Sequence, residues 1–204
     1  MRFLALGDSY TIGEGVREHE RWPVHLATML RANGIDVGEP ELIARTAWTS
    51  DELADAMADE KPKGPYDLVT LLVGVNDQYR SRPVSSFVPE FETLLKRAVS
   101  LAKRRAGRVI AISIPDWGAT PFAEGRDREL IAKEIGAYNA QAQALAAKAG
   151  VHWVDVTGIT RAMLEEPELV APDGLHPSGE MYRRWAEHLL PIALSALGSK
   201  TRSS

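Results

Sequence analysis

The sequence predicts an α/β fold, a three-layer, flavodoxin-like sandwich in which helices flank a five-stranded parallel sheet. Short apolar runs alternate with segments of helical periodicity along the whole chain. The runs are apolar at consecutive positions, as strands buried on both faces of a parallel sheet require. Neither a repeat nor a low-complexity linker interrupts the alternation. We therefore expect residues 1–204 to form one domain, with a frayed tail at residues 199–204.

The apolar runs and the periodic segments give the expected elements in order. Apolar side chains that recur every three or four residues indicate the helices. One helix is expected to begin at Thr49, because Thr49-Ser50-Asp51-Glu52 has the pattern of a capping box. The expected strands are residues 3–6, 42–44, 68–73, 109–112 and 151–156. The other expected helices are residues 24–35, 86–105, 128–149 and 178–197.

Composition and charge exclude several classes of protein. Hydrophobic residues make up 45% of the chain and charged residues 25%, as is usual for a globular protein. The net charge of -4 offers no basic surface to nucleic acid, and no apolar stretch approaches the ~20 residues of a transmembrane helix. The absence of cysteine excludes disulfides and thiol catalysis. Because Met1-Arg2 leads straight into the first strand without a signal peptide, we expect a cytoplasmic protein.

Residues whose side chains could take part in catalysis follow the first and third expected strands. Ser9 lies directly after the first strand in Gly7-Asp8-Ser9-Tyr10, and Asn76 follows the third in Gly74-Val75-Asn76-Asp77. In doubly wound sheets, ligands bind beyond the carboxyl ends of the strands, so these residues should meet at one edge. A serine at such a turn can act as a nucleophile, and an asparagine amide can donate to a developing oxyanion.

A base for this serine is expected in Asp173-Gly174-Leu175-His176-Pro177. An aspartate three residues before a histidine can bring its carboxylate to the imidazole Nδ1 and leave Nε2 facing the serine. The remaining histidines lie within expected helices, within a strand or in a charged loop, and we interpret them as packing or surface residues: His19, His25, His152 and His188.

These three motifs, in this order, resemble those of the SGNH (GDSL-type) hydrolase family, and the resemblance extends from Phe3 to about Pro191. It implies that Ser9 is the nucleophile and that Asp173 and His176 complete a catalytic triad. It also implies an oxyanion hole that includes Asn76 and the backbone N–H of Ser9. No cofactor and no metal are expected.

One position departs from the family pattern. The second family block usually carries a glycine whose N–H joins the oxyanion hole, and the matching residue in Arg45-Thr46-Ala47-Trp48-Thr49 is Ala47. Alanine keeps the N–H donor. We expect Ala47 to adopt a negative φ, because Trp48 and the helix cap at Thr49 can fix this turn without glycine.

Aromatic and charged residues near the expected site suggest walls for a substrate. The loop 114–122 contains two prolines, Trp117 and Phe122, and should form a stiff apolar wall. Trp48 is expected on the opposite side, and Tyr79 and Arg80 lie just beyond Asn76. We predict Trp48, Tyr79, Arg80 and Trp117 as substrate-binding residues, although the tryptophans could equally cover the core.

Together these observations predict a serine esterase that hydrolyses small acyl esters through an acyl-enzyme, of the esterase, lipase or acyl-thioesterase type. The expected partner is a small-molecule ester. Two alternatives stay open. Strand–helix alternation alone also fits a flavodoxin-like module that binds a cofactor or nucleotide. The alanine at position 47 also allows a catalytically silent relative that binds acylated ligands. An α/β-hydrolase fold is not favoured, because no Gly-x-Ser-x-Gly motif surrounds Ser9.

Overall fold

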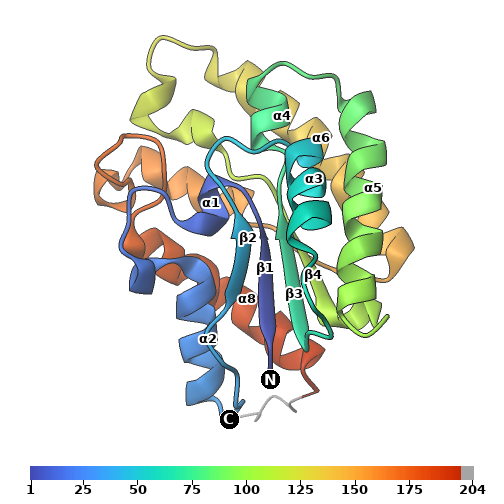
Figure 1. Cartoon of the computed structure of the whole chain (residues 1–204). Helices are drawn as coiled ribbons and strands as arrows, with labels where there is room; N and C mark the ends of the chain where they lie inside the picture. Colours follow the sequence, from blue (N-terminus) through green and yellow to red (C-terminus); the bar gives the residue numbers. More distant parts are fainter. Residues whose placement is uncertain (199–204) are drawn as a thin grey trace.

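A five-stranded parallel sheet with strand order β2-β1-β3-β4-β5 forms the centre of the computed structural model, which describes residues 1–198 (Figure 1). This order is that of flavodoxin-like folds, and the predicted fold class is confirmed. The tail expected at residues 199–204 lies outside the described residues. The strands are β1 (Phe3–Gly7), β2 (Glu41–Ala44), β3 (Leu68–Leu72), β4 (Val109–Ile112) and β5 (His152–Val154).

Helices cover both faces of the sheet. Helices α2 and α8 pack against each other on one face, and α3, α5 and α6 cover the other (Figure 1). No helix within residues 1–198 is both long and apolar enough to cross a membrane. The long helices are α2 (Trp22–Ala32), α3 (Ser50–Glu60), α5 (Val84–Leu101), α6 (Arg128–Ala149) and α8 (Gly179–Ala196). The short ones are α1 (Ser9–Ile12), α4 (Val75–Tyr79) and α7 (Thr157–Thr160).

Burial on both faces explains why the central strands consist of nearly continuous apolar runs. Every residue of β1, β3 and β4 is buried, because helices cover these strands on both faces. The last strand is shorter than the expected 151–156. It ends at Val154, because the next residue, Asp155, turns the chain by accepting hydrogen bonds from the Ser113 hydroxyl and the Thr157 N–H.

Helix ends follow from local chemistry. The capping box at Thr49 is confirmed, since Thr49 and Glu52 exchange the reciprocal side-chain and backbone contacts. Helix α5 ends at Leu101, four residues before the expected end, and Lys103 and Arg104 then take left-handed φ angles of 59° and 58°. A helix cannot continue through such residues.

The short helices α1 and α4, which the sequence pattern did not predict, begin almost at once after β1 and β3. These two strands are neighbours, and the chain leaves β1 toward β2 but leaves β3 toward β4. Such a reversal in strand order opens a crevice at the carboxyl ends of the strands. Close packing also explains Gly7: an added Cβ would lie 2.5 Å from the carbonyl oxygen of Leu72. The fold therefore places the first turns of α1 and α4 at this crevice.

Candidate active site

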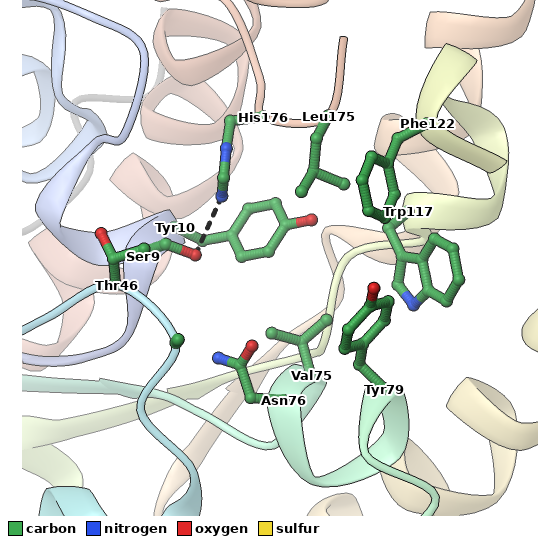
Figure 2. A pocket seen from close by; sticks show the side chains of 11 residues that line it. Ser9, Tyr10, Thr46, Val75, Asn76, Tyr79, Trp117, Phe122, Leu175 and His176 are labelled. Carbon is green, nitrogen blue, oxygen red and sulfur yellow. Dashed lines mark hydrogen bonds between the residues drawn. The ribbon is translucent and has the colours of Figure 1, made fainter. Parts of the chain in front are cut away.

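Ser9, His176 and Asp173 form a connected row of side chains at the crevice. The Nε2 atom of His176 lies 2.9 Å from the Ser9 Oγ (Figure 2), and its Nδ1 atom lies 2.6 Å from Oδ2 of Asp173. Ser9 and His176 are both buried, with only 5% and 6% of their surfaces exposed. The row has the geometry of a nucleophile, a base and a group that orients the base.

The Asp173 carboxylate is held in its ionised form. Its Oδ1 accepts the backbone N–H groups of Leu175 and His176 at 2.9 and 3.0 Å, while Oδ2 faces the His176 ring. Partial burial works against the charge, but these hydrogen bonds outweigh it and keep the pKa of Asp173 below its usual value. A carboxylate at Nδ1 leaves the neutral imidazole with Nε2 as its acceptor atom.

Asp8, the residue before Ser9, fixes the position of Ser9 at the start of α1. Asp8 is the N-cap of α1, and its Oδ1 accepts the backbone N–H of Tyr10 at 3.0 Å. Ser9 is consequently the first residue of a helix, where a backbone N–H has no acceptor within the helix. Asp8 is fully buried, and burial raises the pKa of its carboxyl to about 8. Its Oδ2 has no hydrogen-bond partner among residues 1–198.

Asn76 and Asp77 occupy the corresponding place after β3. The Asn76 Nδ2 donates to the carbonyl of Trp48 at 2.9 Å, and the side chain lines the cavity beside Ser9 (Figure 2). Asp77 does not line this cavity. It is buried and accepts both the N–H and the hydroxyl of Ser50, at 2.9 and 2.8 Å, which fixes the start of α3. Asp77 is therefore a structural neighbour of the site.

Ala47 adopts a φ of 69°, and the expectation of a negative φ is wrong. A hydrogen bond of 3.3 Å from the Trp48 N–H to the Arg45 carbonyl closes a β-turn in which Ala47 is the third residue. A positive φ at this place is the mark of a type II turn, which favours glycine. The helix cap at Thr49 is present but does not move Ala47 out of the left-handed region. An alanine therefore occupies a conformation that costs it roughly 1 kcal/mol or more.

A cavity of about 180 Å³ extends from Ser9. Figure 2 shows Ser9 and His176 at one end and the rings of Tyr79, Trp117 and Phe122 at the other. These rings contact one another, with centroids 5.5 to 6.1 Å apart. The lining is mostly apolar and consists of Ser9, Tyr10, Thr46, Ala47, Val75, Asn76, Tyr79, Trp117, Phe122, Leu175 and His176.

The family follows from a match along the chain. Residues 5–184 match the sequence model of the GDSL-like Lipase/Acylhydrolase family. The chain belongs to this family. It is therefore a carboxylic ester hydrolase, as the sequence resemblance implied. Among curated proteins, the comparison finds no significant match.

Solved structures of similar fold include a lipase/acylhydrolase and two esterases. The lipase/acylhydrolase from Enterococcus faecalis is 22% identical, with all of both chains covered and a TM-score of 0.68. The esterase EstA from a Pseudoalteromonas species is 16% identical over 97% of this chain and 99% of its own, with a TM-score of 0.70. The acetyl xylan esterase AlAXEase is 17% identical over 94% and 98%, with a TM-score of 0.71. At these sequence identities, the likeness to the solved structures supports the fold of this GDSL-like hydrolase alone.

The predicted substrate-binding residues separate into two pairs. Tyr79 and Trp117 line the cavity of this GDSL-like hydrolase. Trp48 and Arg80 do not belong to its lining. Trp48 packs against the hydrophobic core. The Arg80 guanidinium donates to the Ala47 carbonyl at 2.7 Å.

Several lining residues were not singled out from the sequence. Tyr10, Thr46, Val75 and Leu175 each stand next to a predicted site residue along the chain. Sequence adjacency was therefore the signal that could have found them. Tyr10 also packs on the His176 ring, with centroids 5.1 Å apart, which restricts how that ring can rotate.

Proposed function

We propose that this hydrolase is a serine esterase that cleaves small acyl esters through an acyl-enzyme. The observation that carries the proposal is the row Ser9–His176–Asp173, with contacts of 2.9 and 2.6 Å, at one end of an apolar cavity. In this proposal Ser9 is the nucleophile, His176 the base and Asp173 the residue that orients the imidazole.

The first half of the reaction forms the acyl-enzyme. The Ser9 Oγ attacks the ester carbonyl carbon while its proton passes to Nε2 of His176. The resulting imidazolium is stabilised by the Asp173 carboxylate, and His176 then gives the proton to the departing alcohol oxygen. In the second half, water attacks the acyl-Ser9 ester, again with His176 as base, and the carboxylic acid leaves.

Three N–H donors are proposed to stabilise the tetrahedral oxyanion: the backbone N–H groups of Ser9 and Ala47 and the Asn76 side-chain amide. Each belongs to a residue that lines the cavity, and they come from the ends of three neighbouring strands. The bond from Asn76 to the Trp48 carbonyl uses one amide hydrogen and leaves the second for the oxyanion. Donors fixed in this way need little reorganisation when charge develops.

The acyl group is proposed to occupy the apolar end of the cavity, between Val75 and Leu175 and against Tyr79, Trp117 and Phe122. With the oxyanion beside Asn76 and the leaving oxygen beside His176, this end is the direction that remains for the acyl chain (Figure 2). The small volume of this cavity favours short acyl chains. We also propose a cytoplasmic location. Because the chain has no cysteine, its folding depends on no disulfide and hence on no oxidising compartment.

Turnover of p-nitrophenyl esters of increasing acyl length tests the proposal, with the Ser9→Ala protein as the control. We expect hydrolysis that is fastest for short chains and falls by several orders of magnitude in the Ser9→Ala protein. Tight binding of acylated ligands without turnover would instead support the catalytically silent alternative. The strained Ala47, in place of the glycine usual in the family, is the feature that suggests this alternative. A thioester and an acetylated sugar, tested beside the esters, identify the preferred leaving group.

A further inference from the structure

The hydroxyl of Tyr10 faces the part of the cavity that we assign to the acyl group. The Tyr10 ring packs on the rings of His176 and Trp185, with centroids 5.1 and 6.3 Å away. These contacts fix the direction of the ring. Figure 2 shows its hydroxyl pointing away from Ser9, toward the end of the cavity with the three aromatic rings. Because only 3% of Tyr10 is exposed, its hydroxyl faces the cavity and not the outer surface of the protein.

This hydroxyl has no hydrogen-bond partner within residues 1–198. The backbone N–H of Tyr10 donates to Asp8, but the phenol oxygen makes no bond of its own in this part of the chain. The other lining side chains that carry a hydroxyl or an N–H group each have a partner: Ser9 and His176 pair with each other, Thr46 with Glu14, Asn76 with the Trp48 carbonyl, Tyr79 with Arg126, and Trp117 with Gln78. Tyr10 therefore presents an unpaired polar group to an apolar space.

An unpaired hydroxyl becomes unfavourable once a substrate displaces the water around it. The cavity measures about 180 Å³, so an acyl chain that fills it leaves little room for water beside Tyr10. A buried hydroxyl without a partner costs free energy, and a hydrogen bond to the substrate removes this cost. Burial also raises the pKa of the Tyr10 phenol above its ordinary value, so the hydroxyl stays protonated at neutral pH and can donate.

We propose that this hydrolase prefers acyl groups that carry a hydroxyl or carbonyl oxygen along their chain, and that the Tyr10 hydroxyl selects them through a hydrogen bond to this oxygen. The preference rests on the proposed esterase function and on the placement of the acyl group in it. An unsubstituted acyl chain would leave the phenol unpaired in the filled cavity. A site that hydrogen-bonds a polar substituent rejects the analogue that lacks it for this reason.

Hydrolysis of matched esters by the natural chain and by the Tyr10→Phe protein tests the proposal. The substitution removes the oxygen and keeps the ring that packs on His176. The matched esters are ethyl lactate with ethyl propionate, and ethyl 3-hydroxybutyrate and ethyl acetoacetate with ethyl butyrate, followed by acid release in a pH-stat. The measured quantity is the ratio of kcat/KM for the oxygenated ester to kcat/KM for its unsubstituted partner. The intrinsic reactivity of each ester cancels when this ratio is compared between the two proteins.

The two members of a pair should respond to Tyr10→Phe in opposite directions. We expect the ratio to fall about tenfold for at least one oxygenated ester, a loss in the range of one net hydrogen bond. The value of kcat/KM for the unsubstituted ester should rise, because phenylalanine leaves no unpaired hydroxyl beside an apolar chain. A residue that only supports the fold would lower both values together and leave the ratio unchanged.

Tyr182→Phe is the matched control. Tyr182 is fully buried and does not line the cavity, and its hydroxyl also has no partner among the described residues. Its substitution should leave the ratio for every pair of esters unchanged. Should Tyr10→Phe not fold, Tyr10→Met, which also lacks a hydroxyl, takes its place, because the ratio cancels a general loss of activity.

Binding to the Ser9→Ala protein gives a readout that needs no hydrolysis. Titration of the same esters, followed by NMR, compares Tyr10 with Phe at this position in the Ser9→Ala background. The oxygenated ester with the largest ratio should bind up to about tenfold more weakly with Phe, and its unsubstituted partner should not. A natural chain that hydrolyses no ester would contradict the proposed function, and this binding comparison would still decide the role of Tyr10.

Three outcomes would overturn the proposal: ratios for all pairs that are equal in the natural and Tyr10→Phe proteins, an equal fall of the ratio in the Tyr182→Phe protein, or binding of the oxygenated esters to the Ser9→Ala protein that does not depend on the Tyr10 hydroxyl.

Discussion

The side-chain amide of Asn76 donates to the carbonyl of Trp48 at 2.9 Å and so joins the end of β3 to the turn after β2. Twenty-eight positions separate the two residues along the chain. The bond fixes the orientation of the amide beside Ser9. Asn76, a proposed oxyanion donor, thereby also supports the turn that contains Ala47, the residue of another proposed donor.

Asn76→Ala should lower kcat by roughly 10²–10³, the usual loss for one oxyanion donor, with a small change in KM. The substituted residue is half-buried at the cavity, so the fold should persist. Steady-state kinetics on a short p-nitrophenyl ester, with circular dichroism to verify folding, is the measurement. A large rise in KM at constant kcat would make Asn76 a ground-state binding residue instead.

Ala47→Gly should stabilise the protein, because it relieves an alanine at a φ of 69°. Relief of roughly 1–2 kcal/mol exceeds the roughly 0.5–1 kcal/mol by which glycine stabilises the unfolded chain. The net gain of up to about 1.5 kcal/mol corresponds to a rise in Tm of up to about 6 °C for a domain of this size. We expect kcat to be equal to or above that of the natural chain. A clear fall in Tm would show that Ala47 is not strained.

Asp8→Asn should change how stability depends on pH. The folded carboxyl has its pKa raised to about 8, whereas the unfolded one ionises near its ordinary value of 3.8. Between these values the unfolded state has lost the proton and the folded state keeps it, so Asp8 destabilises the fold increasingly as pH rises. The slope is at most about 1.4 kcal/mol per pH unit.

Asparagine mimics the protonated carboxyl and does not titrate. The Asp8→Asn protein should therefore gain stability relative to the natural chain from about pH 4 to about pH 8, and the difference should then level off. Denaturant unfolding at a series of pH values measures this difference. A constant difference over the whole range would mean that Asp8 titrates normally in the folded protein.

Phe122→Ala should shift the preferred substrate toward longer acyl chains. The ring lines the far end of the cavity and is 38% exposed, so its removal opens space without emptying the core. The value of kcat/KM should rise for the longer p-nitrophenyl esters relative to the acetate. Leu164→Ala, another exposed apolar residue but one outside the cavity lining, is the control. An unchanged chain-length profile would place the acyl group elsewhere.

Much of the fold could be predicted from the sequence because the signals are local. Apolar runs and helical periodicity predicted five strands and the long helices, and the motifs that carry Ser9, Asn76 and His176 placed these residues correctly beside one another. The short helices α1 and α4 lack a periodic pattern, since four or five residues are too few to show one.

The features that were missed depend on contacts between distant segments. The positive φ of Ala47 belongs to a turn that Asn76 and Arg80 contact from 28 and 33 positions away along the chain, and no local pattern reveals it. Arg80, predicted as a substrate-binding residue, instead donates to the Ala47 carbonyl and does not line the cavity. Trp48 was ambiguous for a related reason, because the sequence alone does not separate a residue that covers the core from one that lines a cavity.

The central claim is that Ser9 is the nucleophile, and labelling with a fluorophosphonate tests it most directly. Such a probe forms a covalent bond only with an activated serine, and mass spectrometry of the labelled peptide identifies the residue. Ser100→Ala, which removes an exposed serine from α5, is the control. We predict one label on Ser9 in the natural chain and in the control, and none in the Ser9→Ala protein. Labelling that persists in the folded Ser9→Ala protein would contradict the account.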